Sequence, residues 1–253
     1  MKELTDSQLL RYSRQIMLPQ MDVVGQERLL NATALVLGVG GLGSPVALYL
    51  ASAGVGRLIL VDDDDVELSN LQRQIAHSCA AIGQPKVESA AASVHRLNPD
   101  VQLELIGERP SAAKLQQLVD SADVVVDCSD NFSTRFQLNE CCVTALTPLV
   151  SGAAIRLEGQ VSVFDSRQPE APCYRCLYQP QPDESLSCSA SGVLAPLVGT
   201  IGSVQALEAV KLLTGIGQPL VGRVQFYDAL SSSWREMRLP KDPQCPVCGD
   251  SAS

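Results

Sequence analysis

The sequence predicts an α/β fold built on a doubly wound, mostly parallel sheet. Residues 34–62 read as an apolar strand, a glycine turn, a helix and a second strand that ends in an acid. A further apolar strand, 124–130, also ends in acids, and helical segments separate the strands. In a Rossmann-like sheet of this kind the ligand crevice lies beyond the carboxyl ends of the strands, where Asp62 and Asp130 stand.

The turn after the first strand is rich in glycine, which permits positive φ and lets phosphate oxygens approach backbone amides. Ser44 and Pro45 open the next helix and Gly54 ends it, so the amide groups at Ser44 are expected to point toward an anion. Asp62 is expected to bond a ribose hydroxyl. These features predict a nucleotide site without choosing between NAD, FAD and ATP. The four glycines of the turn are Gly38, Gly40, Gly41 and Gly43.

The beginning of the chain is expected to form one amphipathic helix over residues 5–18, with Thr5 or Asp6 as its N-cap. Arg11 and Arg14 fall on or beside the exposed side of this helix. Its apolar face is expected to consist of Leu9, Leu10, Ser13, Ile16 and Met17.

The middle of the chain continues the alternation, with helices predicted at about 86–97 and 111–120 and a strand at 101–105. From Pro148 the pattern changes, because the next extended segments follow one another without a helix. We therefore expect an antiparallel C-terminal extension of the sheet. Its predicted parts are strands at 149–150 and 160–164 around Gly159, a loop at 179–192, a long apolar helix at about 193–214 and a strand at 223–229.

The composition limits the class of protein. With 253 residues and 45% apolar content the chain can bury a sizeable core, and a net charge of -9 is unlike that of a nucleic-acid-binding surface. The uncharged stretch 34–56 is long enough to span a membrane, but six glycines and a proline interrupt it, which indicates a buried strand and a core helix. No apolar run follows Lys2, so we expect a cytoplasmic protein without nucleic-acid or membrane partners.

Two Cys-x-x-Cys pairs, Cys173 with Cys176 and Cys245 with Cys248, predict a zinc site. Four thiolates make a closed tetrahedral site without an open position for water, so the metal is expected to be structural and to hold the C-terminal tail against the middle of the chain. Redox-active pairs and chance are the alternatives. The nine cysteines do not suggest a disulfide framework, and four others are expected to be small core residues: Cys79, Cys128, Cys141 and Cys142.

Several cationic residues accompany the nucleotide unit, namely Arg14, Arg73 and Lys86, together with Asn70. A dehydrogenase needs little positive charge near its cofactor, whereas a triphosphate needs cations that stabilise the developing charge. A carboxylate such as Asp130 could hold magnesium. Each residue also has an alternative structural interpretation, as a solvated surface charge for the cations or as a helix cap for Asp130.

These residues belong to longer motifs in which the chain resembles the MoeB/ThiF/HesA family of adenylyltransferases, the bacterial relatives of ubiquitin-activating enzymes. The resemblance covers essentially residues 5–249 and includes both cysteine pairs. The other motifs are Arg11-Tyr-Ser-Arg14-Gln, Gly38-Val-Gly-Gly-Leu-Gly43, Leu68-Ser-Asn-Leu-Gln-Arg73-Gln, Gly83-Gln-Pro-Lys86 and Asp127-Cys-Ser-Asp130-Asn131.

The resemblance implies an activity. In this family the C-terminal glycine carboxylate of a small ubiquitin-like sulfur carrier ending in Gly-Gly attacks the α-phosphate of MgATP, giving an acyl-adenylate and pyrophosphate. No general base is needed, since the nucleophile is already ionised. The family also implies a homodimer and, as a sulfur donor, a sulfurtransferase or cysteine desulfurase. The whole chain, 1–253, is expected to be one adenylation domain, with N-terminal helices to about residue 30, a nucleotide-binding half at 31–150 and a carrier-binding, zinc-clamped half at 151–249.

The resemblance also implies residue roles. Asp62 takes the ribose, Asp130 binds magnesium, and Arg14 is supplied by the other subunit. The remaining residues implied in the nucleotide site are the glycines of the turn, Ser69, Asn70, Arg73, Lys86 and Asn131.

Two branches of the family are both represented. Residues 150–160 and 173–177 look most like the MoeB branch, which serves molybdenum cofactor synthesis through a MoaD-like carrier, and this is the favoured interpretation. Residues 62–66 and 232–235 look more like the ThiF branch, which serves the thiamine pathway through ThiS. Cys188, in the predicted loop, is either a spare thiol or a residue that links covalently to the carrier or passes sulfur.

Two other classes of function remain open from the residues. An NAD-dependent oxidoreductase shares the glycine turn and Asp62 but leaves Arg14, Arg73 and Lys86 unexplained. A catalytically silent scaffold would bind the carrier without turnover.

Overall fold

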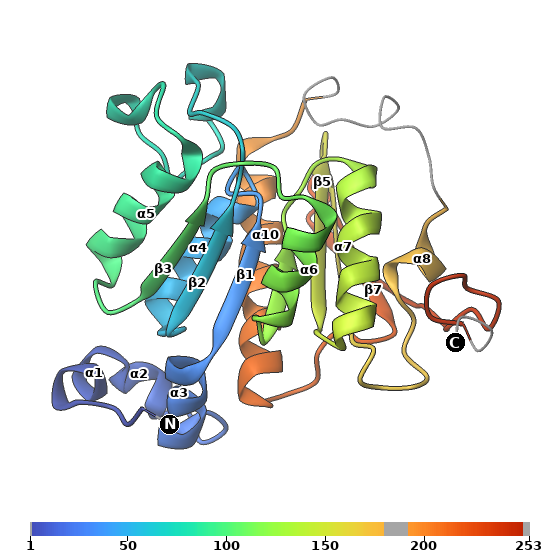
Figure 1. The fold of residues 1–253 in the computed structure, drawn as a ribbon, viewed down its shortest axis with the longest axis horizontal. Coiled ribbons are helices and arrows are strands. Elements are labelled where there is room, and N and C mark those ends of the chain that lie inside the picture. The colour runs from blue at the N-terminus through green and yellow to red at the C-terminus, as the bar shows by residue number, and fades with distance from the viewer. Residues whose placement is uncertain (1, 180–191, 250–253) are drawn as a thin grey trace.

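The computed structural model describes residues 2–179 and 192–249, in which eight strands form one sheet (Figure 1). The strand order is β3-β2-β1-β4-β5-β6-β7-β8. Pairing is parallel from β3 to β5 and antiparallel from β5 to β8, which confirms the predicted fold class. The strands are β1 Thr33–Leu37, β2 Arg57–Val61, β3 Gln102–Ile106, β4 Val124–Asp127, β5 Leu149–Ile155, β6 Glu158–Phe164, β7 Arg223–Asp228 and β8 Ser233–Arg238.

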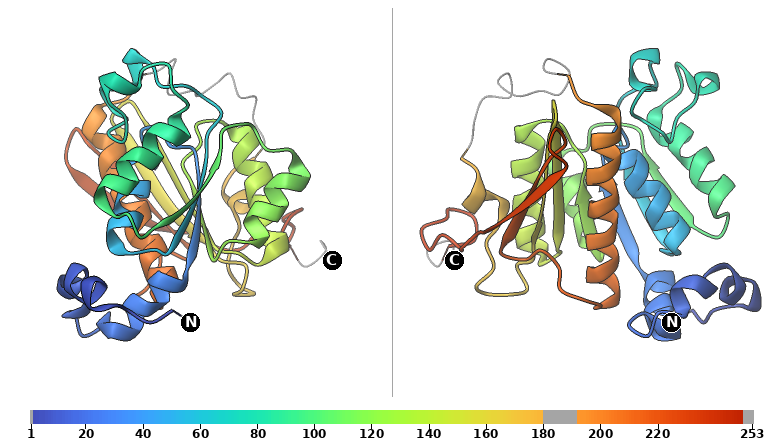
Figure 2. Two further views of the ribbon diagram at one scale, coloured as in Figure 1. Left: turned by 60° about the vertical axis from the view of Figure 1, so that its left-hand side comes forward. Right: turned by 180° about the vertical axis from the view of Figure 1, so that it is seen from behind.

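Helices cover both faces of the sheet (Figures 1 and 2). One face packs against α4 (Gly43–Ala53), α5 (Lys86–Leu97) and α10 (Ala195–Thr214), and this layer contains the larger apolar core. The other face packs against α6 (Ala112–Asp120) and α7 (Phe132–Ala145) around a second core. β1, β2 and β4 are buried along nearly their whole length, as expected for parallel strands covered on both faces.

The N-terminal region differs from the prediction, because two short helices, α1 (Asp6–Arg11) and α2 (Ser13–Ile16), replace the single helix expected over 5–18. Tyr12 separates them: its side chain is buried, and its hydroxyl accepts a hydrogen bond from Asn98 Nδ2 at 2.8 Å. Of the two predicted caps, Thr5 is the N-cap of α1, and Asp6 is the first residue of the helix.

The expected apolar face of this region is also wrong. Leu10 and Met17 are 78% and 70% exposed, since the segment turns at Tyr12 and leaves these side chains beyond the core. α3 (Asp22–Asn31), which follows, packs against α10 and ends the region of N-terminal helices expected to about residue 30.

The uncharged stretch 34–56 forms β1 and α4, so the strand-and-helix interpretation is confirmed. By length and composition α10 could cross a membrane, but it packs on α4, β5 and β6 as the central helix of the larger core. Gly152 allows this close contact, because a Cβ there would lie 2.2 Å from Cδ of Gln205 on α10.

The predicted helices at 86–97 and 111–120 and the strand at 101–105 are confirmed to within a residue, whereas the strand expected over 124–130 ends at Asp127. β8 was missed because all six of its residues are exposed and it pairs with β7 at the end of the sheet, so no apolar alternation marks it. α7 was missed because its apolar residues follow no clear helical period. The predicted loop at 179–192 lies outside the described residues except at its two ends.

The four cysteines expected in the core divide into two groups. Cys128, Cys141 and Cys142 are buried as predicted, and burial raises the pKa of each thiol. Cys79 is exposed, which corrects the prediction. It begins the short 3-10 helix η2 (Cys79–Ala81) on the surface. Within this helix the buried side chain is that of Ala81.

Candidate active site

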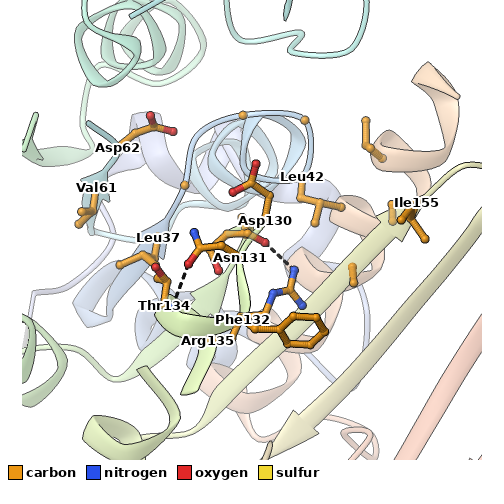
Figure 3. A pocket seen from close by; sticks show the side chains of 18 of the residues that line it. Leu37, Leu42, Val61, Asp62, Asp130, Asn131, Phe132, Thr134, Arg135 and Ile155 are labelled. Atoms are coloured by element: carbon orange, nitrogen blue, oxygen red, sulfur yellow. Dashed lines mark hydrogen bonds between the residues drawn. The ribbon is translucent and has the colours of Figure 1, made fainter. Parts of the chain in front are cut away.

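A cavity of about 420 Å³ opens at the carboxyl ends of β1, β2 and β4 (Figure 3). The glycine turn lies on one side of it, and the loop from β4 into α7 lies on the other. The cavity continues over β5, β6 and β7, where Ala153, Ile155, Gln160 and Phe226 line it. The parallel half of the sheet and its antiparallel extension therefore share one cavity.

Three of the four motif glycines, Gly38, Gly40 and Gly41, line this cavity as predicted. Gly38 has a φ of +88°, a conformation that residues with a Cβ rarely adopt. Gly43 is not among the lining residues and has a packing role, since a Cβ there would lie 1.9 Å from the carbonyl oxygen of Gly38.

The prediction for Ser44 is wrong, because this residue does not point toward an anion site. The residue is fully buried, its hydroxyl donates to the Val39 carbonyl at 3.2 Å, and its amide donates to the Gly40 carbonyl at 2.9 Å. The residues just before α4 that line the cavity are instead Gly40, Gly41 and Leu42.

Asp62 and Lys86 meet at the end of β2. Asp62 Oδ2 accepts from the Val39 amide at 2.8 Å, and its Oδ1 lies 3.8 Å from Lys86 Nζ. Burial raises the pKa of Asp62, while Lys86 and the backbone hydrogen bonds act against that rise. Lys86 is 5% exposed and bonds Asp64 Oδ2 at 2.6 Å, so the interpretation of Lys86 as a solvated surface charge is wrong. Both predicted residues line the cavity.

Arg73 also lines the cavity, and its guanidinium donates to the Ser69 carbonyl at 3.1 Å. Ser69 and Asn70 are not lining residues and lie in the 3-10 helix η1 (Leu68–Asn70). Their side chains make local bonds: Ser69 Oγ donates to Glu67 Oε2 at 3.1 Å, and Asn70 Oδ1 accepts from the Glu67 amide at 3.3 Å. The structure therefore places these two residues beside the cavity wall rather than on it.

Asp130 and Asn131 lie opposite Asp62 at the cavity mouth (Figure 3). Asn131 is the N-cap of α7, and its Oδ1 accepts from the Thr134 amide at 2.9 Å. This bond orients the loop so that the exposed Asp130 carboxylate is available to a ligand in the cavity.

A buried pair below this loop, Asp127 and Arg135, escaped the sequence analysis. Asp127 Oδ1 accepts from the Ser129 amide at 3.0 Å and from its hydroxyl at 2.7 Å, and Ser151 donates to Oδ2 at 3.3 Å. Arg135 Nε lies 4.0 Å from Asp127 Oδ2, and the guanidinium also bonds the Ser129 carbonyl. Although burial acts to lower the pKa of Arg135, Asp127 and nearby tyrosines raise it. The pair fixes the loop that carries Asp130.

Arg14 lies on α2, is exposed, and is not among the residues that line the cavity. Its guanidinium donates a weak hydrogen bond to the Met17 sulfur at 4.0 Å. Several large apolar side chains of the N-terminal helices near Arg14 are exposed, and exposed apolar surface can mark an interaction site. These side chains are Leu9, Leu10, Met17, Leu18, Val23 and Val24, which we call the N-terminal apolar surface.

The two cysteine pairs lie 72 residues apart in the sequence, but the fold brings their sulfurs together. Cys173 Sγ lies 3.7 Å from Cys245 Sγ, Cys176 Sγ lies 3.4 Å from Cys248 Sγ, and all four sulfurs fall within 4.8 Å of one another. A tetrahedron with metal–sulfur bonds of 2.3 Å has edges of about 3.8 Å, so the four sulfurs fit a tetrathiolate metal centre. The distances are too long for disulfides. Cys188 lies outside the described residues.

Comparison with known proteins decides the family, because the model of the ThiF family matches residues 12–247. The chain belongs to the ThiF family.

Relatives of this ThiF-family chain include the molybdopterin-synthase adenylyltransferase of Salmonella typhimurium, which is 51% identical over 98% of this chain and 100% of the relative. The ThiS adenylyltransferase of Escherichia coli is 45% identical over 98% of each chain. Among solved structures, E. coli MccB superimposes with a TM-score of 0.85 at 23% identity, over 98% of this chain and 75% of that chain, which shows a shared fold.

Proposed function

We propose that this ThiF-family chain adenylates the C-terminal glycine of a small ubiquitin-like sulfur carrier of the MoaD type, in molybdenum cofactor biosynthesis. The cavity carries the proposal, since its glycine backbone, Asp62, Lys86, Arg73 and Asp130 converge on one space at the sheet's carboxyl edge. The full-length similarity to a molybdopterin-synthase adenylyltransferase supports the choice of carrier.

In this proposal ATP lies between the glycine turn and the α7 loop. Asp62 accepts a hydrogen bond from the ribose, and its low exposure and fixed bond to Val39 set its direction. Arg73 and Lys86 stabilise the charge that develops on the α-phosphate and the departing pyrophosphate. Asn131 acts by capping α7 and orienting Asp130, while Ser69 and Asn70 support Arg73 from η1.

Asp130 would hold the magnesium ion, which would supply positive charge to the phosphate oxygens. Carboxylate oxygen is the ligand that magnesium prefers, and the Asp127–Arg135 pair beneath the loop keeps the carboxylate in place.

The carrier's C-terminal tail enters over the antiparallel extension. This part of the cavity is lined by Ile155, Gln160, Tyr178 and Phe226, which suit an extended glycine-rich tail better than a bulky cofactor. The carrier carboxylate attacks the α-phosphate directly, forming the acyl-phosphate bond as the bond to pyrophosphate breaks.

The active form is proposed to be a homodimer in which Arg14 of one subunit completes the cavity of the other. Within its own chain Arg14 lies away from the cavity, and the N-terminal apolar surface beside it is of the kind that partners cover.

The tetrathiolate centre is proposed to bind zinc, whose charge and tetrahedral preference suit four thiolates. It would hold residues 245–248 against α8 (Tyr174–Leu177), whose first residue, Tyr174, lines the cavity. The proposed sulfur donor, which acts after adenylation, is a sulfurtransferase or a cysteine desulfurase. Cys188 is the candidate thiol for covalent transfer. The proposed location of the protein is the cytoplasm.

A ThiS-type carrier is the second candidate, favoured by the 45% identity to a ThiS adenylyltransferase. Purified MoaD-type and ThiS-type carriers, each ending in Gly-Gly, would be incubated with MgATP and the protein, and the acyl-adenylate weighed by mass spectrometry. The proposal expects a carrier heavier by one AMP group and carrier-dependent pyrophosphate exchange, with the MoaD-type carrier preferred. Adduct on neither carrier, or an absorbance change with NADH instead, would overturn it.

A further inference from the structure

Asn139 is a buried residue in the middle of α7 that none of the roles above includes. Its side chain is 1% exposed, and its Oδ1 accepts a hydrogen bond of 2.8 Å from the backbone amide of Tyr174. Tyr174 directly follows Cys173, the first sulfur of the tetrathiolate centre. One end of the Asn139 amide therefore holds the backbone beside a metal ligand.

The other end of the amide has unused donors. Asn139 Nδ2 is buried and has no hydrogen-bond partner of normal geometry within residues 2–179 and 192–249. Leaving a buried N–H unpaired is unfavourable, so native proteins rarely do so without a partner from a ligand, an ion-bound group or water.

The Cys173 sulfur is the acceptor that the structure offers. Cys173 directly precedes Tyr174, whose backbone amide Asn139 holds, and the Cys173 side chain is fully buried in the same region. A thiol is a weak acceptor, but a thiolate is a strong one, and metal binding converts Cys173 into a thiolate.

We propose that Asn139 is the outer hydrogen-bond donor of the tetrathiolate centre, giving Nδ2–H to Cys173 Sγ when the ion is bound while Oδ1 keeps the Tyr174 amide. Asn139 is thus a positioning residue that acts through Cys173. This inference rests on the proposed metal centre. Such outer partners fix the orientation of a ligand and strengthen metal binding.

The position of Asn139 gives the bond a second consequence. The first turn of α7 carries Thr134 and Arg135 on the cavity wall, and Tyr174 lies on the same wall. Asn139 joins these two segments directly. Loading the centre is therefore expected to tighten the wall of the nucleotide cavity through α7.

The test measures zinc affinity by competition with a chromogenic chelator. Asn139→Asp keeps an oxygen for the Tyr174 amide but loses the donor and adds a negative charge, and we expect it to bind zinc about 10- to 100-fold more weakly than wild type. Glu140→Gln, on the exposed side of the same helix, is the matched control and should bind zinc as wild type does. Circular dichroism of the zinc-loaded proteins checks the fold.

A second measurement needs no variant. In wild-type protein loaded with cadmium-113, an Asn139 side-chain amide proton should show scalar coupling to the metal across the Cys173 sulfur, because a hydrogen bond to a ligand atom transmits it. Absence of this coupling, or affinity of Asn139→Asp within twofold of wild type, would overturn the inference while leaving the metal centre intact. Failure of wild-type protein to bind zinc or cadmium would instead remove the metal centre itself.

Discussion

Lys86 Nζ lies 2.6 Å from Oδ2 of Asp64, a carboxylate that is 69% exposed, while the lysine side chain itself is 7% exposed. The ion pair holds the cation at the rim of the nucleotide cavity. A phosphate group that enters the cavity can replace the Asp64 carboxylate as the partner of Lys86, because Asp64 is exposed to solvent and its ion pair with Lys86 is therefore weak.

Removing this cation should impair catalysis more than folding. We expect Lys86→Ala to lower the rate of carrier-dependent pyrophosphate exchange by roughly 100-fold or more, the usual effect of losing an electrostatic stabiliser of the transition state. Lys2→Ala, at an exposed residue near the N-terminus, is the control. A Lys86→Ala rate within threefold of wild type would exclude Lys86 from the reaction.

The glycine turn should reject even one methyl group at position 43. A Cβ at Gly43 would lie 1.9 Å from the Gly38 carbonyl oxygen, so Gly43→Ala must displace the turn. We expect a loss of about 1–3 kcal/mol in the free energy of unfolding and much weaker ATP binding. Gly199→Ala on α10 is the matched control, because a Cβ there meets nothing within 4 Å. Denaturant melts and ATP titration of both variants would decide the point.

Stability should depend on pH through His77. Its Nε2 bonds the Val39 carbonyl at 3.1 Å, its Nδ1 bonds Ser89 Oγ at 3.0 Å, and burial lowers its pKa below the usual 6.5 of a histidine. The unfolded chain therefore binds more protons near pH 6, so the stabilising contribution is present above pH 6.5 and is lost as the pH falls through the lowered pKa.

The pH experiment compares unfolding free energies between pH 5 and 7.5. His77→Gln should flatten the curve, and His95→Gln, at an exposed histidine, should not. Identical slopes in wild type and His77→Gln would show that His77 does not produce this dependence.

Arg14 gives a test of the proposed dimer. Arg14→Ala and Lys86→Ala should each be nearly inactive alone, because every cavity lacks one of the two cations. Random exchange of subunits makes half of the dimers mixed, and each mixed dimer has one complete cavity, so activity should return to about a quarter of wild type. Mixed samples that stay as inactive as the separate variants would contradict a shared site.

Metal removal should release the C-terminal tail. Chelation of the tetrathiolate centre is expected to expose residues 240–249 to proteases and to weaken ATP binding through the Tyr174 segment. Limited proteolysis and ATP titration of the metal-free protein would measure both effects, with re-addition of zinc as the control. A tail equally protected with and without metal would mean that other contacts hold it.

The features predicted correctly are those with a local signature. The glycine turn, Asp62 at the end of a strand and the paired cysteines depend on spacing along a few residues, and they lie where their motifs placed them. The Asp127–Arg135 pair forms only because α7 packs against the end of β4. The residues that flank Arg135 in the sequence therefore do not reveal its partner. Tyr12 breaks the first helix because its hydroxyl reaches Asn98, a residue 86 positions away. Ser44 faces inward for a similar reason, since the packing of α4 determines its direction.

The exposed edge strand at the far end of the sheet, β8, also bears on the solubility of the protein. β8 leaves one row of backbone donors and acceptors beyond the ladder with β7, a template on which another copy could aggregate. Arg235, Glu236 and Arg238 occupy half of that strand, and bringing identical charged segments together would be costly. Replacing them with β-branched apolar residues should leave the monomer folded and reduce its solubility.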